Sequence, residues 1–319
     1  MTLTGVAGLF PSGACPTAVS DSGELLSLFE GHGFPTASIE DIRTRVVAPP
    51  GEVVLIPVQP VEHPIPGLDE ALRDSAVLIL PLLAFNTEER SIRYLINRLA
   101  TIDFAEACQR GKGVVLFLRD RQAPITVTSD DCTLSIELGE DLEVFAPKIE
   151  PKIKPGEWIS IIQFLEVAIV PHDRGPSFSA TGSLLCDGVA MAHHLHTHLT
   201  MKDTASGAWK LVDDLRKNGQ FPLRLTFENS RIVDITTRDG KSILADLLPF
   251  TDEVLRGEIT EVGFASLSPD DTTDWSINSQ LNEPAGGLHI GLGAGETGIH
   301  IDFISSHATV SDLTGHWQK

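Results

Sequence analysis

The stretch GGLHIGLGAGETGIHIDF, residues 286–303, contains two short apolar runs separated by a glycine-rich turn, which is the pattern of a β-hairpin. Residues two apart in a strand share a face, so His300 and Asp302 point to one side while their apolar neighbours point into a core. His289 lies on the preceding strand. Two histidines and one carboxylate on adjacent strands match a mononuclear Fe(II) or Zn(II) site. The alternative is a hairpin with hydrogen-bonded, partly buried histidines and no metal, and the pattern alone does not choose between them.

A second histidine-rich stretch, HHLHTH at residues 193–198, suggests a competing metal site. In a strand it would place His194, His196 and His198 on one face, and three imidazoles there could hold zinc. No obvious carboxylate lies nearby in the sequence, however, and a solvated strand face explains the pattern as well. We therefore expect an exposed strand without a structural metal.

The charge balance limits the class of partner. With 44 acidic and 24 basic residues, the chain carries a formal net charge of −20 at pH 7. Like charges repel, so this argues against nucleic acid and anionic membranes and favours neutral or basic partners. The longest apolar run, SAVLILPLLAF at residues 75–85, is too short to span a bilayer.

Cysteine usage and the first residues indicate a cytoplasmic protein. The four cysteines are scattered without a CxxC pair, as in reduced cytosolic proteins. The opening MTLTGVAGLFPSGACP lacks the basic segment and the sustained apolar core of a signal peptide.

The first half, residues 1–150, alternates between strand and helix patterns. Apolar runs at 52–58 and 75–85 predict buried strands, residues 89–111 predict a long amphipathic helix, and GVVLFLRD at 113–120 predicts another strand. Buried strands separated by helices are typical of an α/β fold with a mostly parallel sheet. There is no GxGxxG and no Walker loop, so nothing implies a bound nucleotide.

The second half, residues 151–319, reads differently. After a linker predicted at 150–158, short strand patterns dominate, which predicts a β-rich α+β domain. One helix is predicted there, from a cap at Ser242 to a stop at Gly257.

Over residues 154–312, the order of motifs resembles the aminopeptidase T metallopeptidases and their relatives, the 2,5-dihydroxypyridine dioxygenases. The motifs are KPGEWISIIQFLEVAIVP, ATGSLLCDG, LRLTFENSRIVDI, ITEVGFASLSP, GGLHIGLG and GIHIDFISSHATV. The resemblance implies an aminopeptidase T-like fold and a homodimer.

The resemblance also implies a set of ligands. The peptidases hold two metals with residues that correspond by position to Glu166, Glu261, His289, His300 and Asp302, and the dioxygenases use the last three for one iron. An enzyme of this kind would use Fe(II) or Zn(II) held by His289, His300 and Asp302, with Glu166 or Glu261 as the general base.

Three departures favour a member of this family without catalysis. Phe164 and Leu165 stand where the family has a glycine-rich turn, and only eleven positions separate His289 from His300. The family's catalytic tyrosine is also missing, since Tyr94 is the only tyrosine and lies in the first half.

The favoured hypothesis is therefore a peptide-binding protein that needs no cofactor. The resemblance is nearest to the peptide-binding members of crocagin-type ribosomal peptide biosynthesis, which implies binding of a precursor peptide, possibly a basic one. The predicted cleft wall consists of Phe164, Leu165, Glu166, Glu261 and His289. The alternative is the metal-dependent dioxygenase or aminopeptidase.

Overall fold

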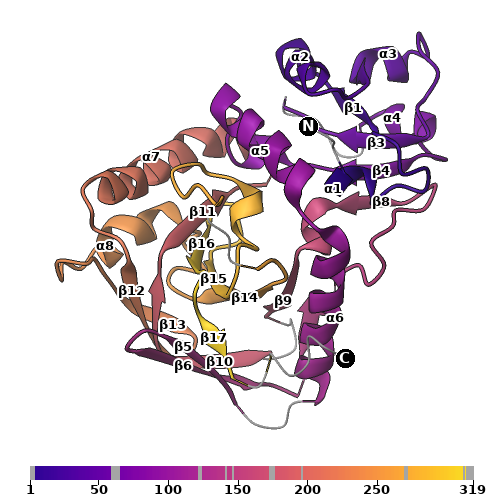
Figure 1. Ribbon diagram of the computed structural model, residues 1–319. Coiled ribbons are helices and arrows are strands. Elements are labelled where there is room, and N and C mark those ends of the chain that lie inside the picture. Colours follow the sequence, from indigo (N-terminus) through magenta and orange to yellow (C-terminus); the bar gives the residue numbers. More distant parts are fainter. Residues whose placement is uncertain are drawn as a thin grey trace.

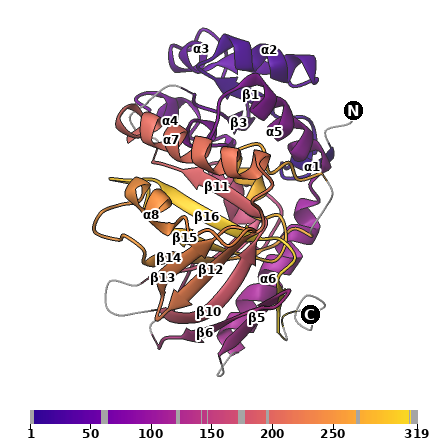
Figure 2. The same cartoon turned by 90° about the vertical axis from the view of Figure 1, so that its left-hand side faces the viewer.

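The chain forms a small parallel sheet at one end and two larger antiparallel sheets packed together at the other (Figure 1, Figure 2). The computed structural model describes residues 4–58, 65–120, 124–140, 142–145, 147–171, 177–194, 197–268, 272–311 and 313. The predicted combination of an α/β part with a parallel sheet and a β-rich part is confirmed.

Sheet A has five strands, all parallel. Its order is β2 (Thr36–Ser38), β1 (Thr17–Ser20), β3 (Glu52–Leu55), β4 (Ala76–Ile79) and β8 (Trp158–Ser160). Alternate residues of these strands point to opposite faces of the sheet, and each face has its own apolar core. Val54 and Leu78 pack toward helices α1 (Thr4–Ala7), α2 (Gly23–Gly31) and α5 (Glu89–Thr101). Val53 and Val77 pack toward α3 (Ile39–Arg43) and α4 (Leu68–Ala71), so helices cover both faces.

Sheets B and C have six strands each, and every pairing in them is antiparallel. Sheet B runs β13 (Arg231–Thr236), β12 (Leu223–Glu228), β10 (Phe178–Cys186), β6 (Cys132–Leu138), β5 (Ile125–Ser129) and β17 (Thr309–Val310). Sheet C runs β11 (Gly188–Ala192), β16 (His300–Ser305), β15 (Leu288–Leu292), β14 (Ile259–Ala265), β9 (Glu166–Val170) and β7 (Glu143–Phe145).

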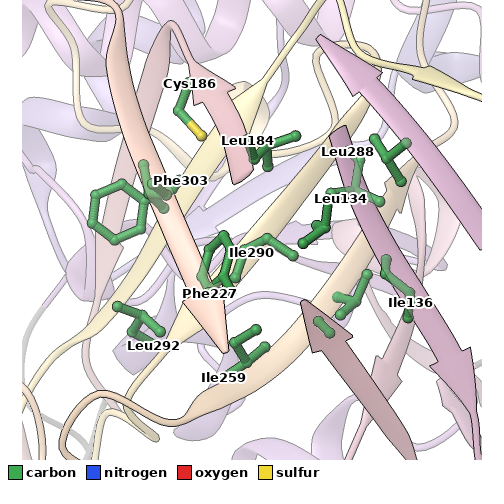
Figure 3. Packing of buried hydrophobic residues seen from close by; sticks show 14 of the residues in the cluster. Leu134, Ile136, Leu184, Cys186, Phe227, Ile259, Leu288, Ile290, Leu292 and Phe303 are labelled. Atoms are coloured by element: carbon green, nitrogen blue, oxygen red, sulfur yellow. The ribbon is translucent and has the colours of Figure 1, made fainter. Parts of the chain in front are cut away.

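One apolar core fills the space between sheets B and C (Figure 3). Leu134 and Phe227 of sheet B and Ile290 and Phe303 of sheet C are fully buried in it. The long helix α7 (His198–Lys217) closes one side of the sandwich with Ala208, Val212 and their neighbours. Because this core occupies one face of sheet C, the other face is left for polar side chains.

Helix α6 (Phe104–Asp120) connects the two parts of the molecule (Figure 1). Its first turns, with Phe104 and Ala107, pack into the core of sheet A, and its last turns, with Val114 and Phe117, pack into the core of the sandwich. Residues 113–120 are therefore helical, and the prediction of a strand there is wrong. The buried residues 114, 115, 117 and 118 have the spacing of one helix face, which a short apolar run conceals.

The predicted helix at 89–111 is divided in two. Helix α5 ends at Thr101, and the side chain of Asp103 accepts a hydrogen bond from the backbone N–H of Glu106, which starts α6 afresh.

The helix predicted between Ser242 and Gly257 is also shorter than expected. Only α8 (Leu244–Leu247) and a 3₁₀ turn, Leu248–Phe250, form there. Proline stops the helix at position 249, and the Ser242 hydroxyl donates to Asp234 instead of capping.

Strand pairing does not divide the chain at residue 150. Strands β5, β6 and β7 come before that point but belong to sheets B and C, whereas β8 comes after it and completes sheet A. The segment predicted as a linker therefore leads into an edge strand of the parallel sheet. None of the helices in the described ranges is both long and apolar enough to cross a membrane.

Candidate functional site

Five metal-type side chains converge on the face of sheet C that is turned away from the sandwich core. They come from four neighbouring strands: Glu166 from β9, Glu261 from β14, His289 from β15, and His300 and Asp302 from β16. The strand register explains the convergence, because Gly291 is paired with both Glu261 and Asp302, so all three share one row across the sheet. The structure thus brings these five side chains together.

His289 lies at the centre of the group and is almost completely buried. Its Nε2 atom is 3.3 Å from Oε1 of Glu261, 3.8 Å from Oδ1 of Asp302 and 3.9 Å from Oε2 of Glu166. Its other ring nitrogen, Nδ1, is buried and has no hydrogen-bond partner. One imidazole edge therefore faces three carboxylates.

His300 is held from both sides. Its Nδ1 atom is 2.6 Å from the carbonyl oxygen of Gly293, to which it donates, and its Nε2 atom is 2.9 Å from Oδ1 of Asp302. The backbone bond fixes the ring orientation, so Nε2 is directed at Asp302 and at Glu261, whose Oε2 lies 3.7 Å away.

Two glycines provide the space for the imidazole rings. A Cβ atom at Gly263 would come within 2.0 Å of the His289 ring, and one at Gly291 would come within 2.6 Å of the His300 ring. Each ring therefore lies directly over the backbone of a neighbouring strand, a position that a side chain there would forbid.

The electrostatics of the site follow from burying acids and bases together. Burial raises the pKa of Glu166 to about 8. Burial alone would lower the pKa of both histidines, but the hydrogen bond to Glu261 and the charge of Glu166 raise that of His289 to about 9. The charge and hydrogen bond of Asp302 likewise raise the pKa of His300 to about 10. Burial opposes ionisation of Asp302, but the positive charge of His300 outweighs it and lowers the pKa of that carboxyl group.

The group opens into a pocket of about 320 Å³ between sheet C, the segment after β4 and the segment before β15. Four carboxylates line it, from Glu166, Glu261, Asp302 and Glu283. Glu283 was not predicted, and its pKa is raised well above the usual range by burial and by the nearby Asp302. No sequence motif marks it, because it lies in an irregular segment that only the fold brings to the site.

Tyr94 contributes to the placement of that segment. Its hydroxyl donates to Oδ1 of Asn282 at 2.5 Å, and the Asn282 amide donates to the carbonyl oxygens of Asp274 and Ile277. The chain's only tyrosine thus contacts the residue next to Glu283, and it does not line the pocket.

Phe164 and Leu165, which were expected on the cleft wall, lie in the core instead. Both are fully buried beneath sheet A, and Phe164 packs edge-on against Phe104 with ring centroids 6.0 Å apart. Ile162, from the same 3₁₀ turn, lines the pocket in their place.

The turn between the two histidines is short but firmly anchored. Asp252 accepts hydrogen bonds from the backbone N–H groups of Ala294, Gly295, Thr297 and Gly298. Burial works against its ionisation, but these bonds and that of the Thr297 hydroxyl lower the pKa of Asp252 to about 2. Asp252 thus fixes the turn of the hairpin whose two strands, β15 and β16, carry His289 and His300.

The stretch at 193–198 does not form the exposed strand face that was predicted. Strand β11 ends at Ala192 and helix α7 begins at His198, so the histidines cannot share a strand face; His196 lies outside the described residues. His193 is instead buried, and its Nε2 atom is 2.8 Å from Nδ1 of His198, with the two rings stacked. Burial lowers the pKa of His193 to about 4.

Three residues of the group fit a metal ion as they lie, and of the predicted ligands His289, His300 and Asp302 only His289 is among them. Glu166, Glu261 and His289 each offer a ligand atom, and these atoms lie within 4.8 Å of one another. Oε2 of Glu166 is buried and has no hydrogen-bond partner among the residues that the structure describes, so a cation there would supply the missing partner. Two imidazoles and three carboxylates suit Zn(II) or Fe(II), which would act as a Lewis acid toward a bound substrate.

A family model of the crocagin biosynthetic proteins CgnE/B matches residues 14–312. The chain therefore belongs to this family, as its sequence motifs predicted. No curated protein matches its sequence. Among solved structures, AmpT from Thermus thermophilus is similar with a TM-score of 0.47 and 15% identity, covering 97% of this chain and 94% of the other. The 2,5-dihydroxypyridine dioxygenase from Pseudomonas putida KT2440 has a TM-score of 0.46 and 11% identity, covering 98% and 94%.

Proposed function

We propose that this protein binds a peptide by its amino group, or by a basic side chain, and releases it chemically unchanged during the biosynthesis of a peptide natural product. The observation that carries the proposal is the pocket of about 320 Å³ whose described lining residues include four carboxyl groups and no lysine or arginine. An ammonium or guanidinium group there would meet the oxygen acceptors of several carboxyl groups at once. Membership of the crocagin biosynthetic family supports a peptide as the partner.

The pocket is a better candidate than the adjacent strand edge. Peptides often bind by adding a strand to an open sheet edge, and β11 is the edge strand beside the pocket. The side-chain amide of Asn278, however, accepts from the N–H of Met191 and donates to its carbonyl oxygen. Trp275 also packs against Gly188 at the other end of β11, so this edge is covered.

A second candidate function is a metal-dependent hydrolase or dioxygenase. It is favoured by the five converging ligand residues and by the unpartnered Glu166 oxygen. His289, His300 and Asp302 would hold Fe(II) or Zn(II), and Glu166 or Glu261 would accept a proton from water or substrate. We expect no cofactor to be needed for peptide binding.

Calorimetry with a pooled library of amidated hexapeptides, followed by resynthesis of the best binder, tests the first candidate. We expect acetylation of the peptide amino group, or of its lysines, to weaken binding at least tenfold, because a buried charged hydrogen bond contributes about 1.5–3 kcal/mol. Glu261→Gln should weaken binding in the same way, whereas Glu253→Gln, an exposed position outside the pocket, should not.

The same preparation, free of a histidine tag, tests the second candidate. It is incubated with the binder in added Fe(II), Zn(II) or Mn(II), and the products are followed by mass spectrometry. Turnover that is lost in His300→Ala but kept in His307→Ala, an exposed control, would establish the enzyme and contradict the proposal. Binding without turnover in any metal, retained in His300→Ala, would support the proposal. Light scattering of the same sample tests the predicted homodimer.

A further inference from the structure

A larger pocket of about 750 Å³ adjoins the acidic pocket. It lies between the start of α5, one face of α7 and the segment 276–278. Phe85 and His193 line both pockets, so the two lie side by side. A peptide whose first residue enters the acidic pocket would therefore extend into this second space.

The second pocket has a net positive lining, whereas the described lining of the first has carboxyl groups and no lysine or arginine. Its charged lining groups are four cations and two anions: Arg90, Lys202, Lys210, Lys217, Glu88 and Asp213. Residues 202, 205, 206, 209, 210, 213 and 217 have the spacing of one helix face, so α7 presents its basic side to the pocket.

Two of these cations remain available to a ligand. Arg90 pairs with Asp274 at 2.7 Å and Lys217 pairs with Asp213. Lys210 only approaches Asp214, at 4.0 Å, and Lys202 makes no ion pair with any residue that the structure describes. Trp209 lies between them on the same helix face and offers an apolar contact.

His193 forms the wall where the two pockets meet. Its ring is stacked on that of His198, with Nε2 2.8 Å from Nδ1, and it is also held by a backbone hydrogen bond with Ala84. A peptide that reaches both pockets would pass this fixed pair of rings.

We propose that the second pocket is a subsite for a carboxylate of the same peptide whose amino group enters the acidic pocket. This inference rests on the proposed function. It defines the ligand as a segment with an amino group at one end and a carboxylate a few residues further on, since an extended chain advances about 3.3–3.6 Å per residue. The carboxylate is that of a glutamate or aspartate side chain, or of the peptide's own C-terminus.

Calorimetry of synthetic variants of the best-binding hexapeptide tests the subsite. One series carries a single glutamate at each position from 2 to 6 with an amidated C-terminus, and a matched series carries glutamine. A third arm has glutamine throughout and a free C-terminal acid. We expect one register, or the free acid, to bind about fivefold more tightly than its neutral counterpart at low salt.

The protein variants identify where that gain arises. Lys202→Gln with Lys210→Gln should remove the glutamate or free-acid advantage and leave the effect of amino-group acetylation intact. Lys241→Gln, an exposed lysine outside both pockets, should change neither. If acetylation weakens binding but no carboxylate adds affinity, or if the gain survives in the double variant, the subsite is refuted and the proposed function stands. If no peptide binds in any form, the proposed function is overturned and the subsite with it.

Discussion

The two histidine clusters of this protein have opposite environments, although one is obvious in the sequence and the other is dispersed. His289 and His300 lie on neighbouring strands of sheet C, each ring above a glycine and facing carboxylates, which raise their pKa values to about 9 and 10. His193 and His198 lie at the end of a strand and the start of a helix, stacked on each other. Burial lowers the pKa of His193 to about 4.

The difference shows that the surrounding acids decide what a buried histidine can do. A histidine among carboxylates is held in its protonated form, because its partners favour the charged ring, and it must lose that proton before it can bind a metal ion. A histidine against another histidine stays neutral and serves as a hydrogen-bonding group. The number of consecutive histidines in the sequence distinguishes neither case.

The largest effect is expected from removing the space under His289. Gly263→Ala would place a Cβ atom 2.0 Å from the ring, so ring or strand must move. We expect a loss of about 3 kcal/mol of unfolding free energy, at the upper end of overpacking effects, measured by urea denaturation. Gly31→Ala on α2, where nothing lies within 4 Å, is the control. Equal stability of both variants would show that the ring is not fixed over the glycine.

The next effect separates the two clusters by pH. The pKa of His193 lies below its unfolded value, so the unfolded chain binds a proton first and stability falls as pH drops from about 6.5 to about 4. His193→Gln should remove this dependence, which amounts to about 2–3 kcal/mol. Chemical denaturation at several pH values measures it, with His32→Gln, a half-buried histidine on the opposite part of the molecule, as the control. An unchanged pH profile in His193→Gln would contradict the assigned environment.

A smaller effect is expected from loosening the hairpin that carries His300. Asp252→Asn replaces the carboxylate that accepts the backbone N–H bonds of the turn with an amide. We expect the free energy of unfolding, measured by urea denaturation, to fall by about 2 kcal/mol at pH 7. Because the pKa of Asp252 is lowered to about 2, its contribution is present above the unfolded value near 4 and is lost as pH falls toward 2. The difference in unfolding free energy between wild type and variant should therefore become smaller as the pH falls from about 4 toward 2. Asp246→Asn, exposed on α8, serves as the reference.

The smallest effect is expected at the exposed end of the obvious cluster. His194 is exposed, and its backbone N–H donates to the carbonyl oxygen of Gly295. His194→Gln should change stability by no more than about 0.5 kcal/mol. A thermal melt that shifts by more than a few degrees would show that the ring has a structural role.

The sequence was sufficient for much of the site because strand periodicity is local. Alternation alone placed His300 and Asp302 on one face, and the order of motifs placed Glu166, Glu261 and His289 near them. Glu283 could not be found in this way, since an irregular segment has no period and its position depends on contacts with α5 that are distant in sequence.

The sequence was less informative where a pattern has two readings. The apolar run at 113–120 suits a strand or one face of a helix, and only its packing between two cores decides for α6. Phe164 and Leu165 were placed on the cleft wall by position within a motif, but their size makes the core their lower-energy location. Apolar residues next to a site residue therefore say little about the wall of the site.

The interleaved order of the strands has a consequence for synthesis on the ribosome. Sheet A lacks its edge strand β8 until residue 160 has emerged, and β5 of sheet B has no partner on its outer side until β17, at Thr309–Val310, arrives. After β5 and β6 have been made, more than half of the chain must therefore be translated before this edge of the sandwich is covered. Such an exposed edge attracts other chains. Nascent chains stalled near residue 250 should accordingly be cleaved by protease within β5 and β6, whereas the full-length chain should be protected there.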